Sequence, residues 1–104
     1  MDIKYRKVVI NIYIIERITY KDDTERRDNI YSARKGCIGK LYDIIVGQVL
    51  WFEYIYNNER NDKKGYLKTS VVESFVEDSD KIIVETLNSV YYFKKLLSRN
   101  PLSL

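Results

Sequence analysis

The feature that most constrains the fold of this chain is its supply of residues that favour β-strands. Ile, Val, Thr, Phe, Trp and Tyr make up 40 of the 104 residues, whereas alanine occurs once, at Ala33. β-Branched and aromatic side chains pack well on a pleated sheet, and alanine is the best helix former. No long stretch keeps an apolar period of 3.6 residues. The sequence therefore predicts a mainly β domain with less than about 15% helix.

Runs of alternating or continuous apolar residues mark the expected strands. They cover residues 8–20, 49–56, 65–72 with a bent continuation to 76, 81–87 and 90–96, with a shorter strand at 30–34. The first run is longer than an ordinary strand, so we expect it to contain a bend or a bulge. Asn88 and Ser89 predict a tight bend between the last two strands. Residues 41–45 predict a short helical turn or an irregular packed loop.

Side-chain alternation predicts which face of each strand meets the core. In the first strand the even positions are the more apolar set, so we expect them to point inward and the odd positions to lie partly in water. Glu53 and Lys68 mark the solvated faces of the 49–56 and 65–72 strands. The expected solvated faces carry Tyr13, Ile15, Trp51, Glu53, Ile55, Tyr66 and Lys68.

Five or six short strands joined by polar turns predict a small antiparallel barrel or a strongly bent sheet, SH3-like or OB-like. The runs at residues 68–72 and 82–91 resemble those of SH3-like small barrels, and this likeness implies no particular activity. We expect one domain over residues 1–97, with residues 98–104 as a C-terminal tail.

The residue inventory excludes most familiar catalytic and metal sites. The chain has no histidine, one cysteine and four glycines without the spacing of a phosphate-binding loop. The acidic groups at residues 22–28 and 73–80 are interpreted as solvated turns, and Cys37 as a buried, inert thiol. We therefore expect no enzyme activity, no metal ion and no cofactor.

Charge and hydropathy bound the setting of the protein. Its apolar runs are too short to span a bilayer as a helix, no cleavable leader follows the N-terminus, and a lone cysteine does not suggest an oxidising compartment. We expect a cytoplasmic protein without a membrane partner, in its own cell or in a host cell. Ile, Asn, Lys and Tyr, which have AT-rich codons, make up 41 residues, and this bias fits an AT-rich bacterium, a virus or a mobile element.

The functional hypothesis favoured by these patterns is a non-enzymatic protein-binding module. A sheet face anchored by Trp51, Tyr66 and Tyr13 would dock on a larger protein and occlude it, as an inhibitor or adaptor encoded by a virus or mobile element would do. Self-association of the chain differs from this hypothesis only in the identity of the partner.

The alternative hypothesis is a small barrel that binds single-stranded nucleic acid. Basic residues and an aromatic ring would form a groove that tracks phosphates and stacks bases. The net charge of +3 is modest for such a protein. The candidate residues are Arg26, Arg27, Arg34, Lys35, Lys94, Lys95 and Tyr91.

Overall fold

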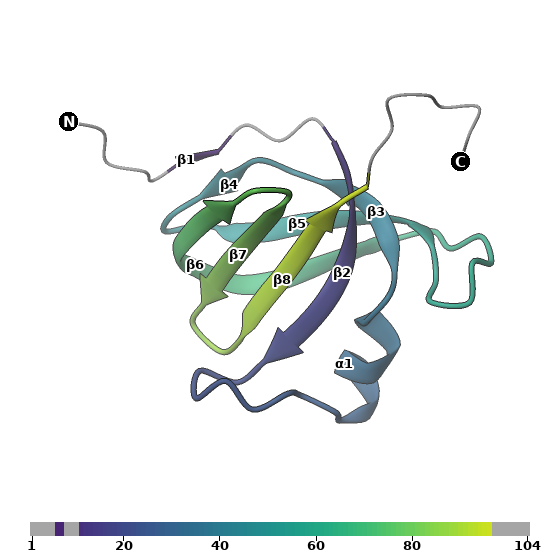
Figure 1. Cartoon of the computed structure of the whole chain (residues 1–104), viewed down its shortest axis with the longest axis horizontal. Coiled ribbons are helices and arrows are strands. Elements are labelled where there is room, and N and C mark those ends of the chain that lie inside the picture. The colour runs from purple at the N-terminus through teal and green to yellow at the C-terminus, as the bar shows by residue number, and fades with distance from the viewer. Residues whose placement is uncertain (1–5, 8–10, 97–104) are drawn as a thin grey trace.

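A computed structural model of the chain describes residues 6–7 and 11–96. In this part of the chain, six strands close into a barrel, a separate two-stranded sheet lies beside it, and one short helix lies below it in the view of Figure 1. The elements in chain order are β1 (Arg6–Lys7), β2 (Ile12–Thr19), α1 (Asn29–Arg34), β3 (Ile38–Leu41), β4 (Ile44–Ile45), β5 (Val49–Tyr56), β6 (Tyr66–Asp78), β7 (Lys81–Thr86) and β8 (Val90–Lys95).

The barrel is an antiparallel meander. Its strands follow the order β2-β3-β5-β6-β7-β8, and β8 pairs back onto β2 to close it, while among the described residues β1 and β4 pair only with each other. Closure gives the six main strands a partner on each side, which removes long exposed sheet edges. The predicted small antiparallel barrel is confirmed, and helix accounts for 7% of the structure.

The predicted orientation of the first strand is wrong in its first half. Tyr13 and Ile15 are buried at 4% and 0% exposure, whereas Ile14 between them is only half-buried. The register with β8 shifts between Ile15 and Arg17, which is the expected bulge. A bulge adds one residue to the strand and so reverses the side-chain alternation beyond it. Ile18, an even position, is therefore buried as predicted, but Thr19 is also buried and Tyr20, another even position, is 42% exposed.

Two short segments also differ from the prediction. Residues 30–34 form α1 rather than a strand, and residues 41–45 contain the end of β3 and all of β4 rather than a helical turn. In α1, the helical spacing brings Tyr31 and Arg34 to the same side, where the Arg34 guanidinium lies 4.8 Å from the centre of the Tyr31 ring. Ile30 on the same helix is 61% exposed, so an apolar residue here did not mark a core strand.

The remaining strands agree well with the sequence pattern. β5 has the predicted bounds, β7 and β8 end within one residue of theirs, and the bend at residues 88–89 is present. β6 is longer than predicted and pairs first with β5 and then with β7, with a register shift between Val72 and Ser74. This shift lets one strand turn the corner of the barrel. The predicted tail at residues 98–104 and the first residues of the 8–20 strand lie outside the described residues.

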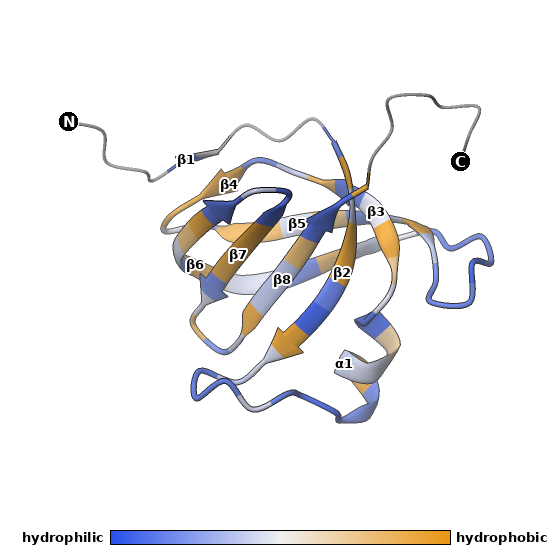
Figure 2. Cartoon of the chain, in the orientation of Figure 1, coloured by the Kyte–Doolittle hydropathy of each residue, from blue (hydrophilic) through white to orange (hydrophobic). Residues whose placement is uncertain are grey.

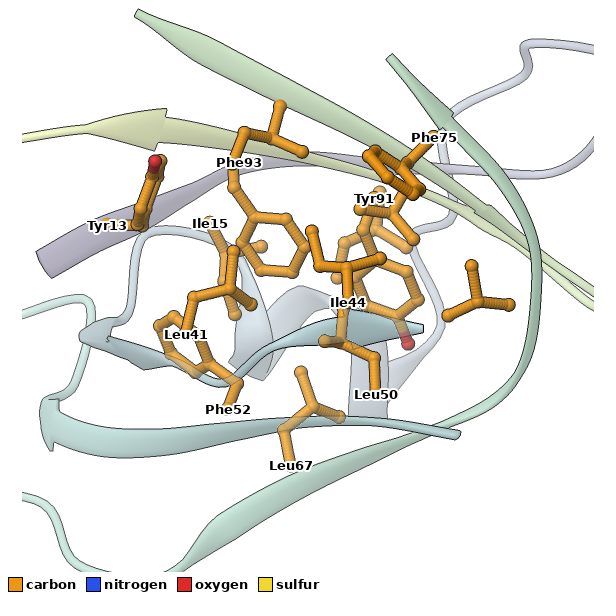
Figure 3. Close-up of a cluster of buried hydrophobic side chains, with 14 of the residues drawn as sticks. Tyr13, Ile15, Leu41, Ile44, Leu50, Phe52, Leu67, Phe75, Tyr91 and Phe93 are labelled. Atoms are coloured by element: carbon orange, nitrogen blue, oxygen red, sulfur yellow. The ribbon is translucent and has the colours of Figure 1, made fainter. Parts of the chain in front are cut away.

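The core fills the barrel with side chains from all its strands. Figure 3 shows apolar side chains from the two halves of the barrel pointing toward a common centre. Phe93 stacks on Phe52 at 5.6 Å and on Tyr91 at 5.9 Å between ring centroids. Leu50 and Phe52 are fully buried, as predicted for their face of β5, although Tyr56 at the end of the same face is 40% exposed, and Cys37 is buried as expected. Figure 2 shows the corresponding alternation of apolar and polar residues along the strands.

A polar cluster joins the α1 region to the end of the barrel. The Arg26 guanidinium lies over the rings of Tyr31 at 3.7 Å and Tyr20 at 4.4 Å, and it donates a hydrogen bond to Ser89 Oγ at 2.7 Å. Ser89 lies in the turn between β7 and β8. Arg26 thereby joins α1 and the residue after β2 to the β7–β8 turn, which is distant in the sequence, and much of its own side chain is removed from water.

Candidate functional site

The most exposed aromatic surface of the barrel lies on the outer side of β3, β5 and β6, which are neighbours in the sheet. Pairing places Trp51 of β5 opposite Lys68 of β6, and Glu53 of β5 between Tyr66 of β6 and Lys40 of β3. Tyr42 follows β3 directly. We call this surface the aromatic face and define it by Lys40, Tyr42, Trp51, Glu53, Tyr66 and Lys68.

Three rings form a continuous row across the aromatic face. Tyr66 lies between the other two, with its ring centre 6.1 Å from Trp51 at an interplanar angle of 88° and 6.2 Å from Tyr42 at 64°. Edge-to-face contact at such distances is favoured by the ring quadrupoles. Trp51 is 42% exposed and Tyr66 is 55% exposed. The row is thus ordered by its own contacts and still open to solvent.

Hydrogen bonds fix one end of this row. The Tyr42 hydroxyl donates to Glu53 Oε1 at 3.2 Å. A hydrogen bond with Tyr66, partial burial and the Glu53 carboxylate together raise the pKa of Tyr42 to about 12. The raised pKa favours the neutral phenol that donates to Glu53, so Glu53 is occupied by a partner on its own surface.

Lysine ammonium groups stand at the two ends of the row. Lys40 Nζ is 5.3 Å from the centre of the Tyr42 ring, and Lys68 Nζ is 5.7 Å from the centre of the Trp51 ring. Both distances allow a weak cation–π attraction. Within residues 6–7 and 11–96, neither ammonium forms an ion pair with a carboxylate. The face therefore presents positive charge to solvent on both sides of its rings.

A surface hollow of ≈370 Å³ adjoins the aromatic face. It combines apolar side chains with the polar groups at its rim, and it shares three residues with the face. It is lined by Lys40, Tyr42, Asp43, Ile45, Gln48, Val49 and Trp51. A concave region next to exposed rings is where a partner side chain gains most burial.

The sequence prediction for this surface is partly matched by the structure. Trp51, Glu53, Tyr66 and Lys68 lie together as expected, and Ile55, at 36% exposure, lies two residues further along β5. By contrast, Tyr13 and Ile15 point into the core, so their predicted exposure is wrong. The sequence does not show which positions of β2 point inward, because both faces of this strand carry apolar residues. The bulge then reverses the alternation within the strand.

Sequence reasoning did not place Lys40 or Tyr42 on this surface. A signal was present, because Lys40 separates two positions, Gly39 and Leu41, that are buried in β3. Recognising residues 38–41 as a strand would have placed Lys40 outward by alternation. The glycines around this segment concealed it, since glycine is depleted in strands.

The basic residues proposed for nucleic-acid binding do not form one groove. Tyr91 is 2% exposed and its hydroxyl accepts a hydrogen bond from Arg34 at 3.0 Å, so it offers no face for stacking. Lys35 forms an ion pair with Glu25 at 2.9 Å. Arg26 is packed between tyrosine rings as described above, and Arg27 is exposed in the loop before α1.

Two other lysines in that set lie elsewhere on the barrel. Lys94 and Lys95 are at the end of β8, where the Lys95 amide donates to Asp80 O in the β6–β7 turn. Arg26, in contrast, binds the β7–β8 turn at the start of β8. The two groups are therefore at opposite ends of one strand. The predicted convergence of these residues around Tyr91 is wrong.

The acidic groups of the chain are mostly engaged by their own surroundings. In the 22–28 loop, Asp23 pairs with Arg17 and Glu25 with Lys35, while Asp22 accepts the Thr24 amide in a tight turn. Among residues 6–7 and 11–96, no cluster of three or more potential metal ligands is present. Burial raises the pKa of the Cys37 thiol, which disfavours the reactive thiolate. No helix in the described part of the chain is long and apolar enough to cross a membrane.

Comparison with known proteins yields no relative on which to base a function. No family model matches the chain, and no curated protein and no solved structure shows significant similarity to it. The functional argument therefore depends on the geometry of the aromatic face.

Proposed function

We propose that this domain is a non-enzymatic protein-binding module that docks through the aromatic face. The observation that carries this proposal is the solvent-exposed row of Trp51, Tyr66 and Tyr42 on a closed barrel. Tryptophan and tyrosine are enriched among the residues that contribute most binding energy at protein interfaces. Such a row offers a large contact area at a small cost in side-chain entropy.

The rigidity of the scaffold supports action by occlusion. The rings are held by edge-to-face contacts and by the bond from Tyr42 to Glu53, so little ordering is needed when a partner binds. A small, pre-organised domain that covers part of a larger protein acts as an inhibitor or an adaptor. The AT-rich codon bias and the single buried cysteine are compatible with an intracellular product of a virus or mobile element.

The geometry of the face favours protein over single-stranded nucleic acid. Bases bind such proteins by stacking flat on aromatic faces. Here the rings meet at 64° and 88°, and ammonium groups stand over Tyr42 and Trp51. A stacking base would displace an ammonium from the ring it covers. The meander order of the strands also differs from the Greek-key order of the OB barrels that bind single strands.

A capture experiment with matched variants tests the proposal. Tagged wild-type protein, Trp51→Ala and Tyr20→Ala are incubated with native lysate, with and without nuclease treatment. Tyr20 is a suitable control because it is also 42% exposed but lies at the opposite end of β2 from the Ile12–Lys40 pair. We expect one protein to be retained by wild type and by Tyr20→Ala and lost by Trp51→Ala. Loss of all retained protein after nuclease treatment, or full retention by Trp51→Ala, would contradict the proposal.

A further inference from the structure

We infer that the partner presents an extended acidic segment in which carboxylates flank an apolar side chain. This inference rests on the proposed function and specifies the chemistry of the partner. It follows from the charge, the spacing and the hollow of the aromatic face.

The charge of the aromatic face calls for an anionic partner. Lys40 and Lys68 carry the exposed positive charge, and in the described residues neither has a carboxylate partner. The six residues of the face hold two lysines against one carboxylate, Glu53, which accepts a hydrogen bond from Tyr42, and the nearby Asp43 pairs with Arg6 at 3.5 Å, so the net charge of the face is positive. Complementary charge guides association and excludes wrong partners. Carboxylates reach these ammonium groups from solvent without displacing them from the rings.

The separation of the two lysines matches an extended chain. Pairing places Lys40 of β3 opposite Glu53 of β5, and Lys68 of β6 opposite Trp51 of β5, so the two lysines are two strands and two residues apart, about 12 Å between their backbones. An extended strand repeats its side chains on one face about every 6.6 Å. A segment with the pattern acidic–any–apolar–any–acidic therefore places its central apolar residue over the row and its two acidic residues near Lys40 and Lys68.

The adjoining hollow accommodates the apolar side chain. Ile45 and Val49 line the hollow together with the Tyr42 and Trp51 rings, and its volume of ≈370 Å³ has room for a large side chain. Burying such a side chain against rings and aliphatic groups supplies the hydrophobic part of the binding energy. The lysines then determine the direction and selectivity of the contact.

The same charge argues against a second copy of this chain as the occupant. In a symmetric dimer each patch contacts its own counterpart. With two lysines and one glutamate on the face, at least one lysine of each copy would have no carboxylate of the other copy to pair with, and an unpaired charge in an interface is unfavourable. The net charge of +3 adds a repulsion between the copies.

The test uses a displayed library of random dodecapeptides selected on the immobilised full chain. We expect enriched peptides to contain the acidic–any–apolar–any–acidic pattern. In fluorescence polarisation with the best of these peptides, Lys40→Gln combined with Lys68→Gln should weaken binding by about tenfold or more and flatten its salt dependence. Lys94→Gln, on an exposed lysine of β8, is the matched control and should bind like wild type.

The variants separate failure of this inference from failure of the proposed function. If the enriched peptides need Trp51 but lack acidic residues, or bind Lys40→Gln/Lys68→Gln as tightly as wild type, the inference is overturned and the binding function stands. If no enriched peptide depends on Trp51, both are overturned. The inference would be overturned in favour of nucleic acid if a dT20 oligonucleotide bound more tightly than the peptides through the same lysines. It would be overturned in favour of self-association if the protein formed concentration-dependent dimers that Trp51→Ala abolished.

Discussion

Adjacent residues on β5 have opposite roles because strand side chains alternate. Trp51 points out of the barrel at 42% exposure, and Phe52 points in at 0%, where it stacks on Phe93. Of these two consecutive aromatic residues, one thus lies on the surface and the other lies in the core. Their substitution should change binding and stability independently.

Substitution of these two residues by alanine should affect stability very unequally. Phe52→Ala should lower the free energy of unfolding by about 3–5 kcal/mol, because it leaves a cavity in the core. Trp51→Ala loses mainly its contact with Tyr66 and should cost about 1 kcal/mol. Urea unfolding followed by circular dichroism measures both values. A larger loss for Trp51→Ala would mean that the inward and outward faces of β5 are reversed.

Gly39 is required by the close approach of β3 to β5. A Cβ atom at this position would lie 2.1 Å from Glu53 O and 2.8 Å from the Phe52 ring, and both are too close for any side chain. We expect Gly39→Ala to cost about 1–3 kcal/mol or more, since the strands must separate to admit the methyl group. Lys40→Ala on the same strand points outward and is the control. Equal denaturation midpoints for the two variants would contradict this explanation.

At the scale of elements, the strands that could be predicted are those with one clear apolar face. β5 carries buried Leu50 and Phe52 opposite a solvated face, and β7 alternates strictly between half-buried and buried residues. The outward position of Trp51 followed from the same rule. β2 did not follow it, because Ile12 and Ile14 are apolar on the side that is only half-buried, and only the pairing with β8 determines where the bulge lies.

The elements that sequence reasoning missed are short and owe their conformation to tertiary contacts. α1 has six residues and none of them is buried, so no amphipathic pattern indicated a helix. Its position depends on the contacts of Tyr31 with two arginines, Arg34 within the helix and Arg26 outside it. β3 and β4 have four and two residues. Lys40 and Tyr42 of the aromatic face belong to this stretch, and this explains why only the other four of its six residues were predicted.

An ion-pair network joins the loop after β2 to the β6–β7 pair. Lys21 Nζ lies 2.6 Å from Glu73 Oε1, 2.7 Å from Glu85 Oε2 and 2.6 Å from Thr86 O. Burial acts to lower the pKa of Lys21, but the hydrogen bonds to both carboxylates raise it overall. The hydrogen bond from Lys21 lowers the pKa of Glu85. One lysine therefore holds the loop against two strands of the barrel.

Lys21→Met should raise the pKa of Glu85 toward its ordinary value of 4.5. Because the pKa of Glu85 is lowered in the folded state, its contribution to stability is present above about pH 4.5 and disappears as the pH falls through the lowered value. The side chains are exposed enough that the loss at neutral pH should be below about 1 kcal/mol. Carboxyl carbon NMR titration measures the pKa. Lys81→Met, which breaks the ion pair with Glu16 at 3.1 Å, is the control and should leave the pKa of Glu85 unchanged.

At the scale of the whole molecule, the barrel closes around a buried phenol. Tyr91 lies on β8, which pairs with β2 at one edge and β7 at the other. Its ring stacks on Phe93 in the core, and its hydroxyl meets the Arg34 guanidinium of α1. Burial raises the pKa of Tyr91 to about 12, although Arg34 acts in the opposite direction. Ionisation of this one group therefore opposes the closed fold.

Stability should fall steeply in alkali because of Tyr91. Its ordinary pKa is 10.0 and its folded pKa is about 12, so between these values the unfolded chain releases a proton that the folded chain retains. The contribution is fully present below about pH 10 and is lost as the pH rises toward 12, at a slope of up to about 1.4 kcal/mol per pH unit. Urea unfolding at a series of pH values from 8 to about 12 measures this slope. Tyr91→Phe keeps the ring and removes the titrating group. Because it lacks the Arg34 hydrogen bond, its free energy of unfolding at pH 8 should be about 1 kcal/mol lower than that of wild type. Its stability should then fall less steeply with rising pH. All other groups are the same in both proteins, so their contributions cancel in the comparison. Parallel curves of stability against pH for the two proteins would show that the Tyr91 hydroxyl reaches water in the folded state. The burial of this side chain beside α1 would then be wrong.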